Sequence, residues 1–412
     1  MRQIELLAPA GSRESLEAAV YFGADAVYAS GKAYGLRAFA DNFSLEEIKS
    51  AAQYIHRHGK RIYITLNAVF HQRDFDGFKE YIAGLQDAGV DAFIISDPGV
   101  LSVVRRVAPE VCIHLSTQAN TTNSHSALFW HTQGVSRIVL SRELSLQEIA
   151  DIRKNTPETL EFEAFVHGAM CISYSGRCLL SNYFTGRGSN QGACAQPCRW
   201  EYYISEKGYD GEYFPVFSDD RGTYIFNSKD LNMLSHLRDL TDVGVVSLKI
   251  EGRMKSAYYV ACVTHAYRRA LDNLAADKEF DRALLDEVNK AGSRAFTTGF
   301  YYGDPRDQGQ DILHSKPRRI YDFVGVVREK RDTHGRILIE QRGKFLVGDQ
   351  LDVLSPTING IFTVNEILTK DQERRDSAPH PKEALFINCP FDLQPGDMLR
   401  TKRETVDVPN NI

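Results

Sequence analysis

Five segments of the chain share one pattern, in which a glycine is followed directly by a run of mostly apolar residues. They read GADAVYAS at 23–30, GKRIYITLN at 59–67, GVDAFIISD at 89–97, GVSRIVLSR at 134–142 and GVVSLKIEGR at 244–253. A glycine in this place is typical of the residue just after a helix, where the backbone turns with a positive φ. The pattern therefore predicts five β-strands, each entered from a preceding helix.

Three more apolar segments complete the series: IELLAPAGS at 4–12, VCIHLSTQ at 111–118 and LEFEAFVHG at 160–168. Amphipathic stretches such as SLEEIKSAAQYIHRHG at 44–59 lie between most of them. Eight strand–helix units in this length predict an α/β fold, a TIM-type (β/α) barrel. A doubly wound parallel sheet is the alternative architecture.

The domain plan follows from changes in this pattern. We expect the barrel to occupy residues 1–300, with 257–289 forming its last helix, and a long insertion at about 167–235 between the last two strands. Residues 301–319, ending in the basic run SKPRR, are predicted to be a linker. Short β runs joined by turn residues then predict a small antiparallel β-barrel over 320–412.

The composition is that of an ordinary globular protein, with 43% hydrophobic and 25% charged residues. Neither a signal peptide at the N-terminus nor a membrane-spanning stretch is visible, so we expect a cytoplasmic protein without a membrane partner. The net charge of −5 argues against coating of nucleic acid by bulk charge. Residues 164–200 nevertheless contain no Asp or Glu, while they include Arg177, Arg187 and Arg199. This segment is interpreted as a surface for an anionic substrate or, alternatively, as a solvated glycine-rich loop.

Four of the seven cysteines cluster in the insertion, at Cys171, Cys178, Cys194 and Cys198. Clustered cysteines in a cytoplasmic protein indicate a metal site rather than disulfides. Their spacing is compatible with zinc or with an iron–sulfur cluster and does not decide between them. The other three, Cys112, Cys262 and Cys389, lie within apolar patterns and are expected to be buried packing residues.

The residues around these cysteines resemble a known family. The stretch EAFVHGAMCISYSGRCLLS at 163–181, together with NQG at 190–192 and CAQPCRW at 194–200, closely resembles the signature of peptidase family U32. LLAPAGS at 6–12, HLSTQ at 114–118 and SLKIEGRMKS at 247–256 extend the resemblance over the whole barrel. Details of these motifs are most similar to the branch of the family that hydroxylates tRNA.

The resemblance implies specific chemistry. Members of that branch make 5-hydroxyuridine at the wobble position of tRNA, so tRNA is the implied partner and prephenate the implied co-substrate. It also implies a [4Fe–4S] cluster on the four matching cysteines, and this chemistry allows for an electron donor. The alternatives that remain open are a U32-type, collagenase-like peptidase and a non-catalytic RNA-binding protein with structural zinc.

The peptidase alternative finds little support in familiar motifs. The chain has neither His-Glu-x-x-His nor Gly-x-Ser-x-Gly, so zinc-protease and serine-hydrolase arrangements are not visible. A cysteine protease that pairs Cys171 or Cys178 with His167 stays open.

Polar residues at the carboxyl ends of the predicted strands are the candidate site, because barrel active sites form there. Arg142 and the cations of 247–256 could bind the two carboxylates of prephenate through charge-assisted hydrogen bonds. The candidate catalytic residues are Arg253, Lys249, Glu251 and His167. The candidate substrate-binding residues are Arg142, His114, Gln118 and Asn67, with Asp97 and Glu143 also at strand ends.

Overall fold

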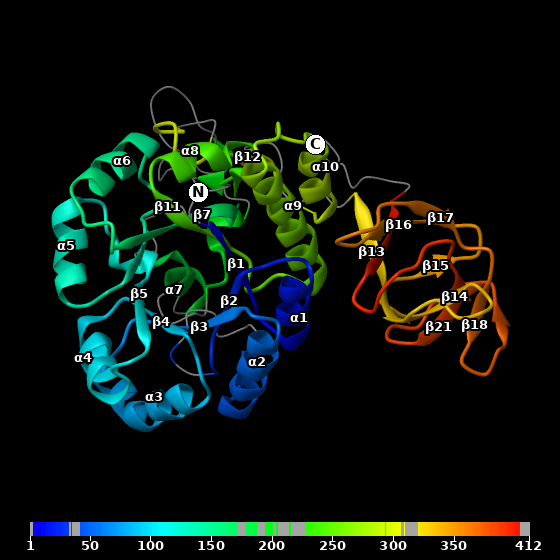
Figure 1. Cartoon of the computed structure of the whole chain (residues 1–412), viewed down its shortest axis with the longest axis horizontal. Helices are drawn as coiled ribbons and strands as arrows, with labels where there is room; N and C mark the ends of the chain where they lie inside the picture. Colours follow the sequence, from blue (N-terminus) through cyan, green and yellow to red (C-terminus); the bar gives the residue numbers. More distant parts are fainter. Residues whose placement is uncertain are drawn as a thin grey trace.

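The predicted TIM-type barrel is confirmed in a computed structural model of the chain. The structure describes residues 3–32, 34, 42–170, 178–187, 194–200, 203–204, 214–215, 228–292, 294–305, 309 and 320–403. Eight parallel strands follow one another around the barrel, and β11 closes it by pairing with both β1 and β7 (Figure 1). They are β1 (Glu5–Pro9), β2 (Ala26–Ala29), β3 (Arg61–Leu66), β4 (Ala92–Ile95), β5 (Cys112–Leu115), β6 (Arg137–Val139), β7 (Glu161–Ala169) and β11 (Val245–Ile250).

The glycines that open the five repeated segments have the conformation that the sequence predicts. Gly23, Gly59, Gly89, Gly134 and Gly244 all have positive φ, between 66° and 101°. Each lies two residues after the last residue of a helix, where a side chain would be strained. The helix-to-strand turns are therefore encoded locally.

Helices cover the outside of the barrel and bury their apolar faces against the strands. They are α1 (Arg13–Tyr21), α2 (Leu45–Arg57), α3 (Phe78–Asp87), α4 (Pro98–Val107), α5 (Ser124–Thr132), α6 (Leu146–Lys154), α8 (Leu237–Asp242), α9 (Ala257–Ala275) and α10 (Ala283–Lys290). The prediction of one helix over 257–289 is wrong in detail. The chain leaves α9 at Asp277, which has a φ of 51°, and α10 begins only after Asp281.

The insertion after β7 contributes several short elements. They are α7 (Leu180–Thr185), β8 (Tyr203–Ile204), β9 (Phe214–Pro215), β10 (Asp230–Asn232) and the 3₁₀ turns η4 (Pro197–Arg199) and η5 (Leu234–His236). Two further 3₁₀ turns, η1 (Gln72–Phe75) and η2 (Thr117–Ala119), follow β3 and β5. β10 pairs antiparallel with the extended end of β7, and β12 (Phe296–Thr297) pairs with β10. The long insertion therefore departs from the carboxyl end of a barrel strand.

The C-terminal part is antiparallel, as predicted, but forms a half-barrel. Eight strands share one sheet in the order β17-β16-β22-β13-β14-β21-β18-β19, and over residues 320–403 no pairing joins its outer strands. A separate hairpin pairs β15 with β20. The strands are β13 (Tyr321–Glu329), β14 (Arg336–Gln341), β15 (Phe345–Leu346), β16 (Gln350–Leu354), β17 (Ile361–Thr363), β18 (Ile367–Thr369), β19 (Arg374–Arg375), β20 (Ser377–Ala378), β21 (Ala384–Asn388) and β22 (Met398–Lys402).

The half-barrel packs on α1 and α9 of the barrel through apolar and charged contacts. Tyr258 of α9 stacks on Phe323 of β13 with ring centroids 5.1 Å apart. Arg400 of β22 is buried and donates to Glu287 of α10 at 2.5 and 2.8 Å, and to Asp352 at 3.2 Å. Removal of either partner would leave an uncompensated buried charge, so Arg400 and Glu287 depend on each other across this contact.

Within the described residues, no helix combines the length and the apolar character that crossing a membrane requires.

Candidate active site

The interior of the barrel is charged, and its N-terminal end is fully paired. Arg137 of β6 donates to Glu161 at 2.8 and 3.0 Å, to Glu5 at 2.5 Å and to Glu163 at 3.4 Å. Tyr63 adds a 2.7 Å hydrogen bond to Glu5. A cavity of about 370 Å³ opens at this end, and charged residues line it: Glu5, Asp25, Lys60, Arg61, Arg137 and Glu161. Because Arg137 uses all its nitrogens, this end is a structural network.

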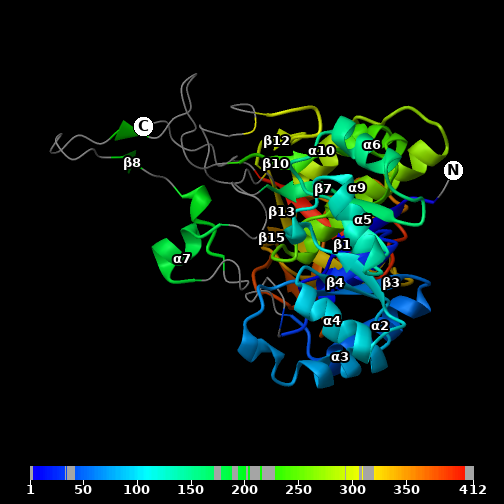
Figure 2. The same cartoon turned by 90° about the vertical axis from the view of Figure 1, so that its left-hand side faces the viewer.

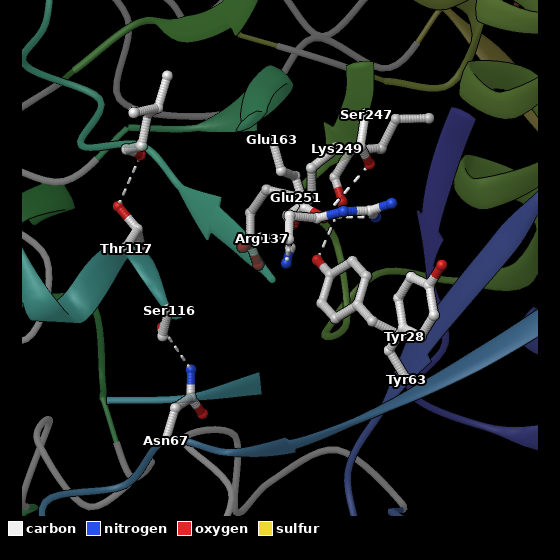
Figure 3. Close-up of polar contacts among 12 residues, drawn as sticks. Tyr28, Tyr63, Asn67, Ser116, Thr117, Arg137, Glu163, Ser247, Lys249 and Glu251 are labelled. Atoms are coloured by element: carbon white, nitrogen blue, oxygen red, sulfur yellow. Dashed lines mark hydrogen bonds and ion pairs between the residues drawn. The ribbon is translucent and has the colours of Figure 1, made fainter. Parts of the chain in front are cut away.

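Lys249 of β11 lies further along the strand toward its carboxyl end, in the middle of the barrel. Its Nζ donates to Glu163 at 2.7 Å, and both side chains are buried. The same Nζ lies 4.5 Å from the centroid of the Tyr28 ring, a cation–π contact. Figure 3 shows Lys249 gathered with Glu163, Ser247 and Arg137. The geometry gives Lys249 a fixed positive charge directly below the C-terminal mouth.

At the C-terminal mouth, two arginines are each held by residues of other strands. Arg253, just after β11, donates to Thr65 of β3 at 3.2 Å. Arg142, just after β6, donates to the carbonyl of Ala169 at 2.5 Å and to Glu251 at 3.4 Å. Its guanidinium also stacks over the Phe165 ring, 3.7 Å from the centroid. Both arginines are buried, so stacking and hydrogen bonds fix their orientation in advance of any ligand.

Three of the predicted substrate-binding residues carry a buried polar atom without a partner. In the part of the chain that the structure describes, Asn67 Oδ1, His114 Nδ1 and Arg142 Nε accept or donate no hydrogen bond. The amide of Asn67 is held in place from its other end, by a 3.1 Å bond to Ser116 (Figure 3). A buried polar group without a partner destabilises a protein by about 1–3 kcal/mol. Asn67 and Arg142 follow the carboxyl ends of β3 and β6, and His114 lies within β5, so a polar ligand that reaches from the mouth into the barrel would satisfy all three.

His114 is neutral in this site. It is 4% exposed and packs edge-on against Tyr63, with ring centroids 4.7 Å apart. Burial lowers the pKa of His114 well below its usual range, and the positive charges of Arg137 and Lys249 lower it further. A neutral imidazole can accept or donate a hydrogen bond to a ligand without changing the charge of the site.

The structure does not bring His167 to this mouth. Its ring is buried among Tyr259 and Tyr267 of α9 and Phe296 of β12. The hydroxyl of Tyr267 lies 3.4 Å from His167 Nδ1. Burial lowers the pKa of His167 to about 4. A bulge in the pairing of β7 with β11 at this point turns the His167 side chain away from the register of Phe165.

The remaining strand-end residues have local structural roles. Asp97 caps α4 by accepting from the backbone of Val100, and Glu143 pairs with Ser141. Gln118 lies half-buried in η2, and its backbone donates to Ser116. The contributions of Thr65, Ser116, Phe165 and Tyr28 were missed from the sequence. A signal for some of them was available in the sequence, because inward-facing residues alternate along a barrel strand and several of these strands already carried a candidate site residue.

The cysteine cluster is described only in part, because Cys171 and Arg177 lie outside the described residues. Cys178, Cys194 and Cys198 are each half-buried. Their segments pack together: α7 contacts η4, and the backbone of Ala195 donates to Ser181 of α7 at 2.9 Å. The backbone of Gln196 also donates to Cys194 Sγ at 3.4 Å.

This donor set suits a thiolate-bound cluster in its residue types. Across the described ranges, however, no three His, Cys, Asp or Glu side chains stand close enough together to hold a metal ion. The predicted set of four therefore rests on Cys171 as well as on the three described cysteines.

One prediction about the other cysteines is wrong. Cys262 and Cys389 are buried as expected, but Cys112 is exposed. It is the first residue of β5, on the strand face opposite to Ile113 and Leu115, and it lies at the rim of the barrel.

The family model for "Peptidase family U32" matches residues 11–311, and that for "Peptidase family U32 C-terminal domain" matches residues 319–400. Among curated proteins, the chain is 38% identical to "tRNA hydroxylation protein P1" of Bacillus subtilis, over 96% of this chain and 94% of that one. It is 36% identical to "tRNA hydroxylation protein P" of Escherichia coli, over 95% and 94%. It is 37% identical to the "23S rRNA 5-hydroxycytidine C2501 synthase" of Escherichia coli, over 67% and 40%. The chain therefore belongs to peptidase family U32.

Proposed function

We propose that this protein is an RNA-modifying enzyme that hydroxylates the wobble uridine of tRNA to 5-hydroxyuridine, with prephenate as co-substrate. Two relatives named for tRNA hydroxylation align with nearly the whole chain, and a third is named for rRNA hydroxylation. The activity that these names share is hydroxylation of RNA. The same reaction class accounts for the polar, preorganised barrel mouth described above.

The observation that carries the proposal is the group of unpartnered atoms at Asn67, His114 and Arg142. They offer an acceptor, a neutral imidazole nitrogen and a cationic donor to one small polar molecule. Prephenate bears two carboxylates, and Arg142 and Arg253 would each bind one through charge-assisted hydrogen bonds. Lys249 would add positive charge from below, partly offset by Glu163.

The uridine would enter the same mouth as a base turned out of its stack, because its C5 atom is otherwise covered by neighbouring bases. Walls of buried side chains would exclude water from the reacting atoms. Glu251, fixed by Arg142, is the carboxylate at the rim and the candidate for moving a proton.

Cys171, Cys178, Cys194 and Cys198 would hold a [4Fe–4S] cluster, which supplies one-electron chemistry when bound. The pairing of α7 with η4 brings the segments of three of these cysteines together. The role of this chain is then to carry the cluster on the insertion at the carboxyl end of β7, on the same side of the barrel as the proposed prephenate site.

Arg253 offers the direct test of the donor site. Anaerobically purified Arg253→Ala should retain its iron and labile sulfide but lose hydroxylation by about tenfold or more, because a charge-assisted bond to the co-substrate is lost. The measurement is 5-hydroxyuridine in nuclease-digested tRNA by mass spectrometry, at several prephenate concentrations. Arg253→Lys, which retains the charge, should keep part of the activity.

Equal prephenate dependence in Arg253→Ala and the natural protein would remove Arg253 from the site. Absence of 5-hydroxyuridine with iron-loaded natural protein, tRNA, prephenate and a reductant would contradict the proposed function itself.

A further inference from the structure

The insertion carries a group of exposed aromatic side chains that the barrel site does not use. Tyr183 is 83% exposed, Phe184 45% and Trp200 46%. The Tyr183 and Phe184 rings meet edge-on at 5.2 Å, and Phe184 lies 6.4 Å from Trp200. Exposed aromatic groups of this kind on a globular protein mark interaction sites more often than chance. These three residues are called the aromatic platform below.

The aromatic platform is held by the body of the insertion. α7, which carries Tyr183 and Phe184, contacts η4, which directly precedes Trp200. Ser181 of α7 is fully buried, and its Oγ accepts from the backbone of Ala195 at 2.9 Å. Figure 2 shows α7 standing away from the barrel, so that it is accessible from outside. The three rings are thus presented on two segments that pack against each other.

The charge of the sequence segment that carries the platform indicates the chemistry of its partner. Between residues 164 and 200 the chain has no Asp or Glu but has three arginines. This segment therefore has no acidic side chain to repel a polyanion, and its arginines would attract the phosphates of a nucleic acid. Aromatic rings in a stretch of sequence that carries arginines and no acidic residue are a combination with which proteins bind single-stranded nucleic acid by base stacking.

The position of the platform relates it to the reaction. Cys178 lies two residues before α7, and Cys198 lies within η4, two residues before Trp200. We propose that Tyr183, Phe184 and Trp200 stack on unpaired bases of the RNA substrate and so hold the loop that contains the target uridine beside the cysteine cluster. This inference rests on the proposed function and adds the surface that recognises a loop rather than a duplex.

The chain contains a spectroscopic probe for this contact. It has two tryptophans, and Trp130 in α5 is only 9% exposed. In a Trp130→Phe background, emission comes from Trp200 alone. Titration with a single-stranded RNA of the anticodon-loop sequence should quench it in a saturable manner, because stacking changes the surroundings of the indole. The same sequence in a duplex should quench it far less.

Substitutions then test each ring. Tyr183→Ala should weaken binding of the single-stranded RNA by about tenfold, the effect expected for loss of one stacked base. Tyr183→Phe, which retains the ring, should bind like the natural protein. Phe129→Ala is the matched control, since Phe129 is 57% exposed on α5, within the barrel's outer layer of helices, and its loss should change nothing.

The inference is overturned if three results are found together: Tyr183→Ala binds RNA normally, Trp200 emission does not change when RNA is added, and the protein still hydroxylates RNA. It is also overturned if the platform variants bind RNA normally and lose activity only when a protein supplies electrons, since the partner would then be a protein. RNA-dependent quenching without any 5-hydroxyuridine would support the platform and contradict the proposed function.

Discussion

The two ends of the barrel use the same kinds of side chain in opposite ways. At the N-terminal end, Arg137 is saturated by Glu5, Glu161 and Glu163. At the C-terminal end, Arg142 and Asn67 retain buried atoms without partners. Saturated networks contribute to stability, whereas unpartnered buried groups reduce stability and persist where a ligand needs them. The contrast separates a structural end from a functional one.

The largest effect should come from breaking the saturated end. Arg137→Ala leaves Glu5 and Glu163 buried without their cation, and we expect the free energy of unfolding to fall by about 3–5 kcal/mol. Urea unfolding followed by circular dichroism measures this. Arg142→Ala at the other end should lower stability much less and activity much more. Similar unfolding midpoints for the two variants would contradict the contrast.

Acid should lower the stability of the protein in two separate pH ranges. Burial lowers the pKa of His167 to about 4, below its value in the unfolded chain, so the unfolded state binds protons first as the pH falls. Stability should therefore decline between about pH 6.5 and pH 4, by roughly 3 kcal/mol for this group. His114, whose pKa is also lowered by burial, should contribute in the same range.

The carboxylates lose their contribution to stability at a lower pH than the histidines do. Burial opposes ionisation of Glu5, but the charge and hydrogen bonds of Arg137 prevail and lower its pKa. Its contribution is therefore present above about pH 4.5 and lost below it. Unfolding free energies measured from pH 7 to pH 3 should show both ranges, and His167→Phe should flatten only the first. A stability that stays constant between pH 6.5 and pH 4 would be inconsistent with neutral, buried histidines.

The smallest change in stability is expected at His114 itself. His114→Phe removes a buried polar atom without a partner and keeps a ring against Tyr63, so the free energy of unfolding should stay the same or rise by about 1 kcal/mol. Hydroxylation should nevertheless fall by more than about tenfold, since the ligand loses a hydrogen bond. Thermal unfolding and the tRNA assay on one preparation compare the two quantities. A clear loss of stability with retained activity would assign His114 to the structural end.

The sequence predicted the barrel because its signals are local. A glycine after each helix and an apolar strand after each glycine require no knowledge of distant contacts. The same signals placed Asn67, Arg142 and Arg253 at strand ends, and the closed sheet then brought them to one end of the barrel, whereas His114 lies within β5. The orientation of His167 was not predictable, because it depends on a bulge between β7 and β11.

The charged interior was also not predicted, although the sequence contains a signal for it. Glu5, Glu163 and Lys249 stand among apolar residues in strands that were described as mostly apolar. A period of two in charged residues indicates an interior face. The pairing of these charges depends on strands that are far apart in the sequence, as the hydrogen bond from Arg137 to Glu5 shows.

The order of strands in the C-terminal half-barrel bears on its synthesis by the ribosome. β22 pairs with β13 on one side and β16 on the other, so it lies in the middle of the sheet although it is the last of these strands to be translated. Until it emerges, β16 and β17 have no link to the rest of the sheet, and Glu287 of the finished barrel lacks Arg400. Docking of this half-barrel onto the barrel is thus a late event in biogenesis, which a nascent chain can complete only once β22 has left the exit tunnel.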